Sequence, residues 1–437
     1  MSAGHRYVLL GLARPRASWF RSVSHWTTSA AIPAEFVKCV SVEELRARLA
    51  GNRTFSAVLL DGSLPVVDRE LLEAARDVGC AVLIVDDGRR PRDWVELGAT
   101  AVLSSTLERE ALLDALVTHA EMVGVVASVV RTATEVDLDL TRSLAPGEVA
   151  VVCGAGGTGV STLAAALAEG LGRMTHHDGR VLLADLALHG EQAMLHDVRD
   201  VVPGIQELVE AHRIGVPSTN DVRALTFEVV ERRYQLLLGL RQARHWPSIR
   251  PHAFQAAFDS LRRAFDVLVC DITADFEGAG ATGSVDVDER NLMARHSAFH
   301  ADVVFVVGRP GVKGMHAQVR VISELVGAGV SPTRVIPVIN EAPGRPGTRA
   351  RINKGIAELT AMVVVDVPMA SPVFVPSRQV EPALRDVVSL PAPLPSLMTG
   401  AYRALIDRLG PNPDSIDHEP QLVAPGSLGT WNEEGAM

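Results

Sequence analysis

A glycine-rich turn between a strand pattern and a helix pattern constrains this chain more than any other feature. Residues 149–153 form a continuous apolar run, which is typical of a strand buried on both faces of a sheet. Glycines follow at positions 154, 156, 157 and 159, and the alanine-rich segment 160–166 is typical of a helix. This order predicts a strand–turn–helix unit of an α/β fold with a parallel sheet.

The turn keeps the frame of a phosphate-binding loop, G-x-x-x-x-G-K-[ST], with one substitution. Gly154 and Gly159 occupy the frame glycines, and Ser161 occupies the hydroxyl position. Backbone N–H groups of such a loop, together with the start of the following helix, hold anionic phosphate. Val160 stands where a lysine would pair with that phosphate. The sequence therefore predicts a nucleotide cradle that lacks a main contributor to hydrolysis.

Polar side chains follow three later strand patterns. Asp185 comes after the apolar run 181–184, Asp271 after 267–270 and Asn340 after 335–339. Because the carboxyl ends of parallel strands share one edge of a sheet, we expect these side chains beside the loop. The predicted cofactor is ATP or ADP with Mg²⁺, with Asn340 hydrogen-bonding an adenine edge. The predicted magnesium ligands are Ser161, Asp185 and Asp271. The predicted nucleotide-binding residues are Gly154, Ala155, Gly156, Gly157, Thr158, Gly159, Val160, Ser161, Thr162 and Asn340.

Residues 148–409 resemble the ParA/MinD family of deviant-Walker ATPases in the order of their elements and in the doubled glycine of the loop. The family loop reads K-G-G-x-G-K-[ST], and here Ala155 and Val160 replace its two lysines. The family's second strand commonly ends D-x-D, and here Ala187 replaces the second acid. The resemblance implies a doubly wound, mostly parallel sheet and a homodimer. The missing cations imply hydrolysis slowed by roughly 10²–10³-fold per lost charge contact.

Two alternatives to a weakly hydrolysing protein stay open, and no catalytic residue is predicted. Arg309 or Lys313, which follow the strand pattern 303–307, could replace the missing lysine in an active ATPase. The chain could instead be a scaffold that binds no nucleotide. A dinucleotide oxidoreductase is disfavoured, because the loop lacks the G-x-G-x-x-G register.

The first part of the chain resembles a degenerate receiver domain with a flavodoxin-like fold. Its strand patterns lie at 7–12, 57–61, 81–85 and 101–103. Asp61 occupies the phosphoacceptor position, but the helper groups of a working receiver are missing. No acid follows the first strand, two serines at 104–105 replace a lysine, and two aspartates at 86–87 replace a hydroxyl. We therefore interpret Asp61 as an ordinary strand-end aspartate and this part as a docking or dimerisation module.

The sequence predicts four parts. They are a receiver-like domain at 5–120, a linker at 121–147, a MinD/ParA-like P-loop domain at 148–409 and a disordered tail at 410–437. This combination resembles the CpaE/TadZ group, and the lysine-free loop is similar to the actinobacterial septum-site-determining type. The resemblance implies positioning of a Flp/tad pilus secretion system, the division septum or both. Its partners would be pilus secretion or cell-division proteins, which would recruit it to a pole or septum.

Composition narrows the partners and the compartment. A net charge of −10 argues against a nucleic-acid partner, which needs an excess of positive charge on one face. No apolar run approaches the ~20 residues of a membrane span, and no signal peptide is recognised. We expect a cytoplasmic protein without direct membrane insertion, whose last helical pattern, at 397–409, packs in the core. The four widely spaced cysteines are expected to be reduced, buried thiols.

Overall fold

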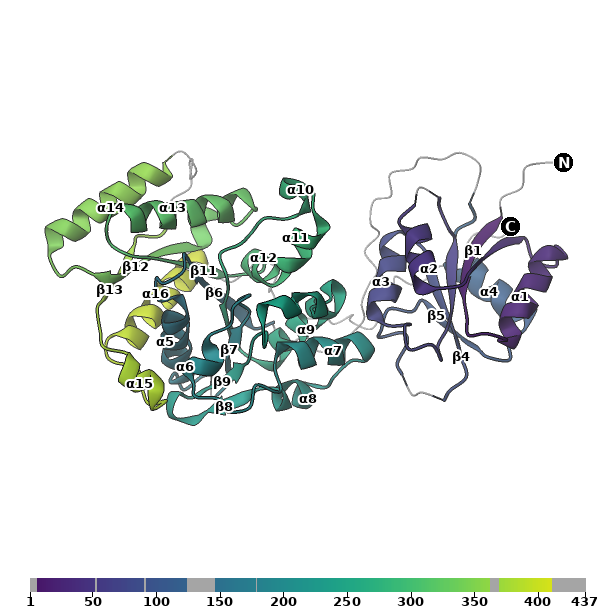
Figure 1. The fold of residues 1–437 in the computed structure, drawn as a ribbon, viewed down its shortest axis with the longest axis horizontal. Helices are drawn as coiled ribbons and strands as arrows, with labels where there is room; N and C mark the ends of the chain where they lie inside the picture. Colours follow the sequence, from purple (N-terminus) through teal and green to yellow (C-terminus); the bar gives the residue numbers. More distant parts are fainter. Residues whose placement is uncertain are drawn as a thin grey trace, which may run out of the picture.

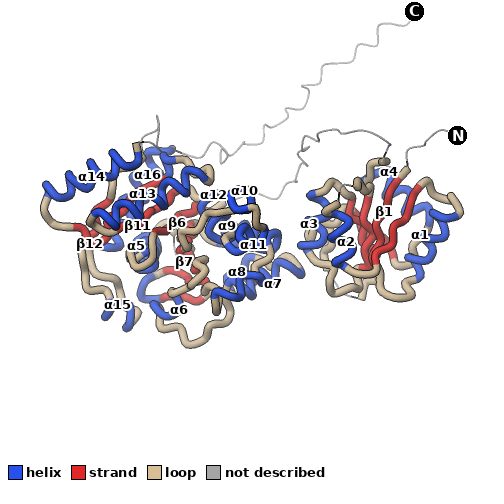
Figure 2. Tube along the Cα trace, turned by 45° about the horizontal axis from the view of Figure 1, so that its top comes forward, coloured by secondary structure: helices blue, strands red, loops and turns tan. Residues whose placement is uncertain are grey.

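The computed structural model of the protein describes residues 6–51, 53–89, 92–123, 146–177, 179–361 and 369–410. Within these residues the chain forms two α/β units, each built on its own sheet (Figure 1). Helices lie on both sides of the strands, as the blue and red segments of Figure 2 show. The predicted α/β fold class with mostly parallel sheets is confirmed.

The first sheet has five parallel strands in the described residues, in the order β2-β1-β3-β4-β5. This order is that of flavodoxin-like doubly wound sheets. The strands are β1 (Tyr7–Leu12), β2 (Ala34–Cys39), β3 (Ala57–Asp61), β4 (Ala81–Asp86) and β5 (Ala101–Ser104). One face is covered by α1 (Ser18–Thr28) and α4 (Arg109–His119), the other by α2 (Val42–Leu49) and α3 (Arg69–Asp77).

The second sheet has eight strands in the described residues, in the order β13-β12-β11-β6-β10-β7-β9-β8. Neighbours are parallel except for the antiparallel pair β8 and β9. Strand β6 lies between β10 and β11, where the strand order reverses, and this is where open α/β sheets bind ligands. The strands are β6 (Glu148–Gly154), β7 (Val181–Asp185), β8 (Phe227–Val229), β9 (Tyr234–Leu237), β10 (Val267–Asp271), β11 (Val303–Gly308), β12 (Val335–Ala342) and β13 (Val373–Pro376).

Alternate side chains of β6 enter two hydrophobic layers, one on each face of the sheet. Val149, Val151 and Cys153 face one layer, and Ala150 and Val152 face the other; all five are fully buried. Burial on both faces explains why this strand reads as a continuous apolar run. The first layer contains α7 (Ile205–Ile214), α9 (Pro251–Ala264), α12 (Leu292–Phe299) and α13 (Val312–Gly327). The second contains α5 (Val160–Gly172) and α16 (Leu394–Leu409).

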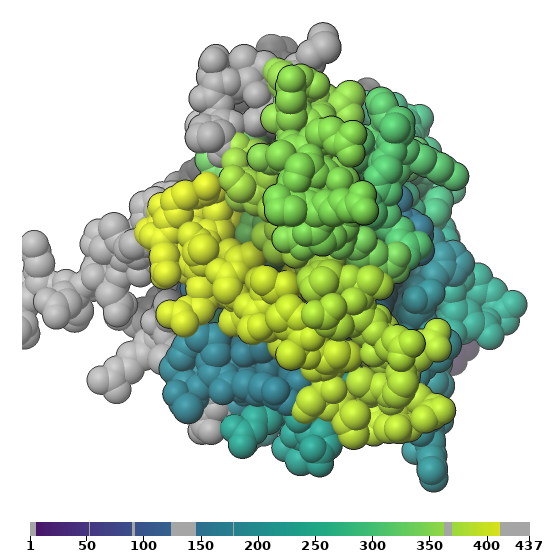
Figure 3. All heavy atoms as spheres, turned by 90° about the vertical axis from the view of Figure 1, so that its left-hand side faces the viewer, coloured from purple at the N-terminus to yellow at the C-terminus, as the bar shows by residue number. Residues whose placement is uncertain are grey.

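Helix α16 packs along α5, and the yellow segment of the chain that contains α16 covers this face of the second unit in Figure 3. A Cβ on Gly170 of α5 would lie 2.7 Å from the carbonyl oxygen of Pro395, so glycine permits the close approach of the two helices. The buried residues of α16 are Leu394, Met398, Thr399, Tyr402 and Leu405. The last helix therefore packs in the core, as predicted.

Helix α3 of the first unit contacts α7 and α9 of the second. Arg69 Nε donates to the carbonyl oxygen of His212 (2.9 Å), in the last turn of α7. Glu70 Oε1 accepts the Ala253 N–H (2.7 Å), in the first turn of α9. Backbone groups at helix ends have no partner within their own helix. Two neighbouring residues of α3 thus satisfy the ends of two helices in the other unit.

The remaining described helices are short or peripheral. They are α6 (Gln192–Leu195), α8 (Thr219–Ala224), α10 (Ala279–Thr282), α11 (Val285–Arg290), α14 (Pro346–Thr360) and α15 (Glu381–Arg385), with 3₁₀ turns η1 (Val230–Arg232), η2 (Ala243–Ser248) and η3 (Pro332–Arg334). No helix in the described ranges is both long enough and apolar enough to cross a membrane. All four cysteines are buried, and none of them forms a disulfide bond.

Most of the predicted linker and tail lies outside the described residues, which break off at 123, resume at 146 and end at 410. The predicted boundaries of the four parts therefore stay predictions.

Candidate phosphate-binding site

The glycine loop joins β6 to α5 at the carboxyl edge of the second sheet. Gly157 and Gly159 have φ angles of 75° and 91°, a region in which residues with side chains are strained. A Cβ on Gly159 would lie 2.4 Å from Nδ2 of Asn340, whereas a Cβ on Gly156 or Gly157 would meet no atom within 4 Å. The loop is therefore packed on its inner side and open on its outer side.

The start of α5 offers unpaired donors to this open side. The first intrahelical bond runs from the Leu163 N–H to the Gly159 carbonyl (3.0 Å). The N–H groups of Val160, Ser161 and Thr162 donate to no acceptor in the described part of the chain. The first turn has no acidic side chain and no side-chain cap. Free N–H groups and the positive end of the helix dipole together favour an anion at this position.

Aliphatic side chains stand at the positions of the two family lysines. Val160 is half-buried against the hydrophobic layer that contains α5, and Ala155 is also half-buried. Arg309 and Lys313 are the two candidates to replace the missing lysine. Arg309 forms an ion pair with Glu341, and Lys313 is exposed without an ion pair to any described residue. The charge of Arg309 is thus already matched by a carboxylate.

The side chain of Asn340 holds the glycine loop through a hydrogen bond. Its Nδ2 donates to the carbonyl oxygen of Thr158 (2.9 Å), and its Oδ1 accepts the Glu341 N–H (2.9 Å). The Thr158 hydroxyl in turn donates to the Ala155 carbonyl (2.6 Å). These contacts give Asn340 a role in holding the loop shape. Its contact with adenine stays a prediction.

The two predicted metal-binding aspartates lie side by side. Asp185 and Asp271 end β7 and β10, and their Cα atoms are partners in the strand register. Both are buried, with 1% and 2% of their surface exposed. Burial raises the pKa of each carboxyl group, and the neighbouring charge of Asp271 raises the pKa of Asp185 further. Hydrogen bonds from the Ser161 and Gln192 side chains oppose the shift at Asp271.

Gln192, which was not among the predicted site residues, is fully buried between these groups. Its Nε2 donates to Oδ2 of Asp271 (2.7 Å) and to the Ser161 carbonyl (3.0 Å). Its backbone N–H donates to Oδ2 of Asp185 (3.0 Å). Gln192 therefore links all three predicted magnesium ligands. No motif marks it; the one signal in the sequence is a glutamine placed seven residues after a strand-end aspartate.

The residues at this edge fit a magnesium ion that arrives with a phosphate. Ser161, Asp185 and Asp271 supply oxygen donors, which Mg²⁺ prefers, usually one or two carboxylates together with phosphate oxygens and water. Oδ1 of Asp185 is buried with no hydrogen-bond partner among the described residues. The described ranges hold no group of three His, Cys, Asp or Glu side chains that would bind a metal alone.

In the first unit, Asp61 is held by local hydrogen bonds. Its Oδ1 accepts the N–H (3.0 Å) and hydroxyl (2.6 Å) of Ser63, and its Oδ2 accepts the Arg14 N–H (3.3 Å). The Arg14 side chain also pairs with Asp87 (3.2 Å). An arginine thus stands in the stretch after β1 where a working receiver carries acids. This arrangement favours the interpretation of Asp61 as a strand-end aspartate.

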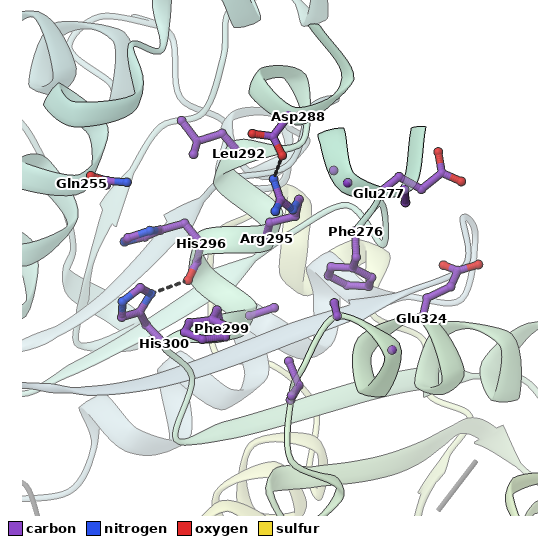
Figure 4. Close-up of a pocket in the computed structure, with 17 residues that line it drawn as sticks. Gln255, Phe276, Glu277, Asp288, Leu292, Arg295, His296, Phe299, His300 and Glu324 are labelled. Atoms are coloured by element: carbon purple, nitrogen blue, oxygen red, sulfur yellow. Dashed lines mark hydrogen bonds and ion pairs between the residues drawn. The ribbon is translucent and has the colours of Figure 1, made fainter. Parts of the chain in front are cut away.

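A separate hollow of about 560 Å³ lies beside α12 and α13, away from the loop (Figure 4). Phe276 and Phe299 line it, and Arg295 within it is paired with Asp288. Burial raises the pKa of Glu324 at its rim. No residue of the glycine loop lines this hollow, so it lies outside the predicted nucleotide site.

Fold and loop together define the class: an α/β protein with a P-loop-type turn at the point where the strand order of its second sheet reverses. No protein-family model and no curated protein matches the chain. Similar solved structures include a ParA family ATPase from Chlorobium tepidum, at 16% identity and a TM-score of 0.41, covering 60% of this chain and 93% of that one.

Two further similar structures contain bound nucleotides. A putative plasmid partition protein from Borrelia burgdorferi bound to AMPPNP has 13% identity and a TM-score of 0.43, covering 60% of this chain and 100% of that one. The septum site-determining protein MinD of Pyrococcus horikoshii, complexed with Mg-ADP, has 16% identity and a TM-score of 0.41, covering 59% of this chain and 95% of that one.

Proposed function

We propose that this protein is a nucleotide-binding spatial regulator of the MinD/ParA type whose ATP hydrolysis is weak or lost. The observation that carries the proposal is the open outer side of the glycine loop, where Gly156 and Gly157 face free space. The unpaired N–H groups at the start of α5 lie next to it. These features supply phosphate binding through the backbone, which needs no lysine.

The same loop explains why hydrolysis is weak. Phosphoryl transfer depends on positioning and on cations that stabilise the transition-state charge. Val160 and Ala155 supply no cation, and Arg309 is engaged by Glu341. An active ATPase that uses Arg309 or Lys313 is the alternative. A nucleotide-free scaffold is less favoured, because no side chain fills the space above Gly156.

We further propose ATP or ADP with Mg²⁺ as the ligand. The Ser161 hydroxyl and the Asp271 carboxylate would hold the ion, and Asp185 would act through its unpaired buried oxygen. When bound, Mg²⁺ neutralises part of the phosphate charge. Gln192 competes for the same Asp271 oxygen, so it tunes how readily the ion binds.

The finer assignment rests on the sequence resemblance. We propose a CpaE/TadZ-like homodimer that positions a Flp/tad pilus secretion system, the division septum or both. Its receiver-like part, at 5–120, serves as a docking module, and pilus secretion or cell-division proteins recruit it to a pole or septum in the cytoplasm. The contacts of α3 with α7 and α9 hold the first unit against the second.

Equilibrium binding of a fluorescent ATP analogue to the full chain, with and without Mg²⁺, tests the proposal. We expect saturable binding together with phosphate release close to the uncatalysed rate. Absence of saturable binding at millimolar nucleotide would overturn the proposal in favour of the scaffold. Rapid phosphate release that disappears in Arg309→Ala or Lys313→Ala, but persists in Arg351→Ala, would establish the active-ATPase alternative.

A further inference from the structure

A pocket of about 880 Å³ lies at the amino edge of the second sheet, opposite the glycine loop. Its lining includes Glu148, Arg180 and Asp266, which stand at or just before the first residues of β6, β7 and β10. Helix α5 begins at the glycine loop and brings Leu171 of its last turn to this pocket, roughly 20 Å away at 1.5 Å per residue. The amino-edge pocket is therefore separate from the candidate nucleotide site.

Positive side chains outnumber negative ones in this pocket. The arginines that line it are Arg180, Arg223, Arg262, Arg263 and Arg403, and two histidines, His176 and His177, lie with them. The acids that line it are Glu148, Asp266 and Asp407. These residues come from the strand starts, the segment after α5, α8, the end of α9 and α16, so the gathering of charge is a product of the fold.

Three of the arginines are partly or wholly engaged by protein groups. Arg180 makes two hydrogen bonds to the Asp266 carboxylate (2.8 and 3.0 Å), so these two opposite charges are paired with each other. Arg223 donates twice to the Ala264 carbonyl (2.6 and 3.2 Å) through Nη2 and Nε, and its Nη1 has no acceptor among the described residues. Arg262 donates through its Nε to the Gly147 carbonyl (3.3 Å), and its Nη atoms have no acceptor in the described part of the chain.

The other two arginines are free. Arg263 and Arg403 are exposed and form no ion pair or hydrogen bond with any residue in the described part of the chain. Among the acids, Glu148 accepts the hydroxyl of Tyr402, and burial raises the pKa of its carboxyl group. Asp407 is the one lining acid without a partner among the described residues. The pocket thus carries guanidinium groups that its own acids do not neutralise.

We propose that the amino-edge pocket binds a phosphate-bearing anion. Guanidinium groups suit this ligand because their planar donor forks match phosphate oxygens in pairs. Arg263 and Arg403 supply the uncommitted charge, and Arg223 and Arg262 supply spare Nη donors deeper in the pocket. Met174 and Ile406 add an apolar wall, so the ligand carries an apolar part beside its phosphate.

The arginines also have a simpler explanation, which the test must separate. Arg262 and Arg263 lie in the last turn of α9, where positive side chains complement the helix dipole. That explanation also covers Arg223, which lies in the last turn of α8, but it does not cover Arg403, which lies two turns before the end of α16. The helix-dipole explanation predicts no bound ligand, so a measurement of phosphate binding distinguishes it from the proposed site.

Calorimetric titration of the full chain with inorganic pyrophosphate is the first test. We expect two sites, of which Arg263→Gln with Arg403→Gln weakens one by about tenfold or more, the usual effect of losing a charge-assisted hydrogen bond. Arg351→Gln is the matched control, because Arg351 on α14 is likewise exposed and unpaired among the described residues. Gly159→Ala is expected to weaken the other site, so failure here and failure at the glycine loop are distinguishable. An unchanged titration in the double variant overturns the proposal.

Arginine modification by phenylglyoxal locates the site without any variant. Pyrophosphate is expected to slow modification of Arg263 and Arg403, read by peptide mass spectrometry, and to leave Arg351 unchanged. Equal modification rates with and without pyrophosphate would overturn the proposal.

A vesicle-binding experiment tests whether the phosphate belongs to a soluble ligand or to a lipid headgroup. Flotation with phosphatidylglycerol vesicles, compared with phosphatidylcholine vesicles, is repeated on the double variant. Binding of pyrophosphate alone supports a soluble phosphorylated ligand. Vesicle binding that the double variant loses supports a lipid headgroup in the same pocket, and binding of neither probe overturns the proposal.

Discussion

At the residue scale, Val160 decides how strongly the loop holds phosphate. Val160→Lys is expected to tighten ATP binding by about tenfold, because a charge-assisted hydrogen bond contributes about 1.5–3 kcal/mol. The side chain at position 160 is half-buried, so a lysine has room to reach the open side of the loop. Calorimetry with ATP measures the change, and Val160→Met controls for length without charge. Equal ATP affinities in the two variants would show that a cation at position 160 does not reach the bound phosphate.

A second prediction at this scale concerns the Asp185 carboxyl group and the pH dependence of stability. Its pKa is raised by burial and by Asp271, so the folded state holds a proton that the unfolded state releases. Stability is therefore expected to fall as pH rises above the usual aspartate range of about 4. The unfolding free energy of the natural sequence is expected to decrease between pH 5 and pH 8. In Asp185→Asn this decrease should be smaller by about 1–3 kcal/mol, because one pKa unit corresponds to about 1.4 kcal/mol. Urea unfolding at both pH values measures it.

The exposed Asp259 on α9 provides the control for that experiment. Asp259→Asn is expected to leave the pH dependence of unfolding unchanged, because this side chain is exposed and unpaired among the described residues. A pH dependence in Asp185→Asn as steep as that of the natural sequence would show that the carboxyl pair does not hold the proton.

At the scale of the element, the turn from β6 into α5 depends on glycine at one position and tolerates a side chain at another. Gly159→Ala places a Cβ 2.4 Å from Asn340 Nδ2 at a φ of 91°. We expect a loss of about 1–2 kcal/mol in unfolding free energy, from the left-handed backbone alone, and weaker ATP binding. Gly156→Ala, whose Cβ meets nothing within 4 Å, is the matched control for stability. Thermal unfolding that ranks the two variants equally would contradict this account of the loop.

At the scale of the whole molecule, α3 joins the two units through charged side chains. Besides the bond from Glu70 to the start of α9, Asp68 forms an ion pair with Arg213. Helix α9 has no side-chain cap from its own segment, so Glu70 serves as its cap. Removal of a cap costs about 1 kcal/mol.

We therefore expect Glu70→Ala with Arg213→Ala to loosen the contact between the units. Hydrogen exchange should rise in the first turn of α9 and the last turn of α7, and small-angle scattering should show a larger radius of gyration. Glu110→Ala, an exposed change on α4 far from the contact, should leave both measurements unchanged. Unaltered exchange in the double variant would show that other contacts hold the units together.

Local patterns predicted most of the strands. Strands β1 and β3 have the predicted bounds, and the strand of the glycine loop extends by one residue at each end. Strand β2 was missed, because it lies at the edge of its sheet and its sequence, Ala34–Cys39, is mostly half-buried and carries a glutamate and a lysine. An edge strand buries less surface, so it leaves a weaker apolar pattern in the sequence.

The sequence by itself determined the α/β fold and the place of the candidate site. Both follow from local causes: apolar runs that need burial on two faces, and glycines that permit a tight turn into a helix. Only the tertiary structure decided that Gln192 links Ser161 to Asp271, that α3 satisfies the ends of α7 and α9, and that five arginines gather at the amino edge. The physical reason is that hydrogen bonds and charge clusters depend on distance in space, and these groups come from segments far apart along the chain.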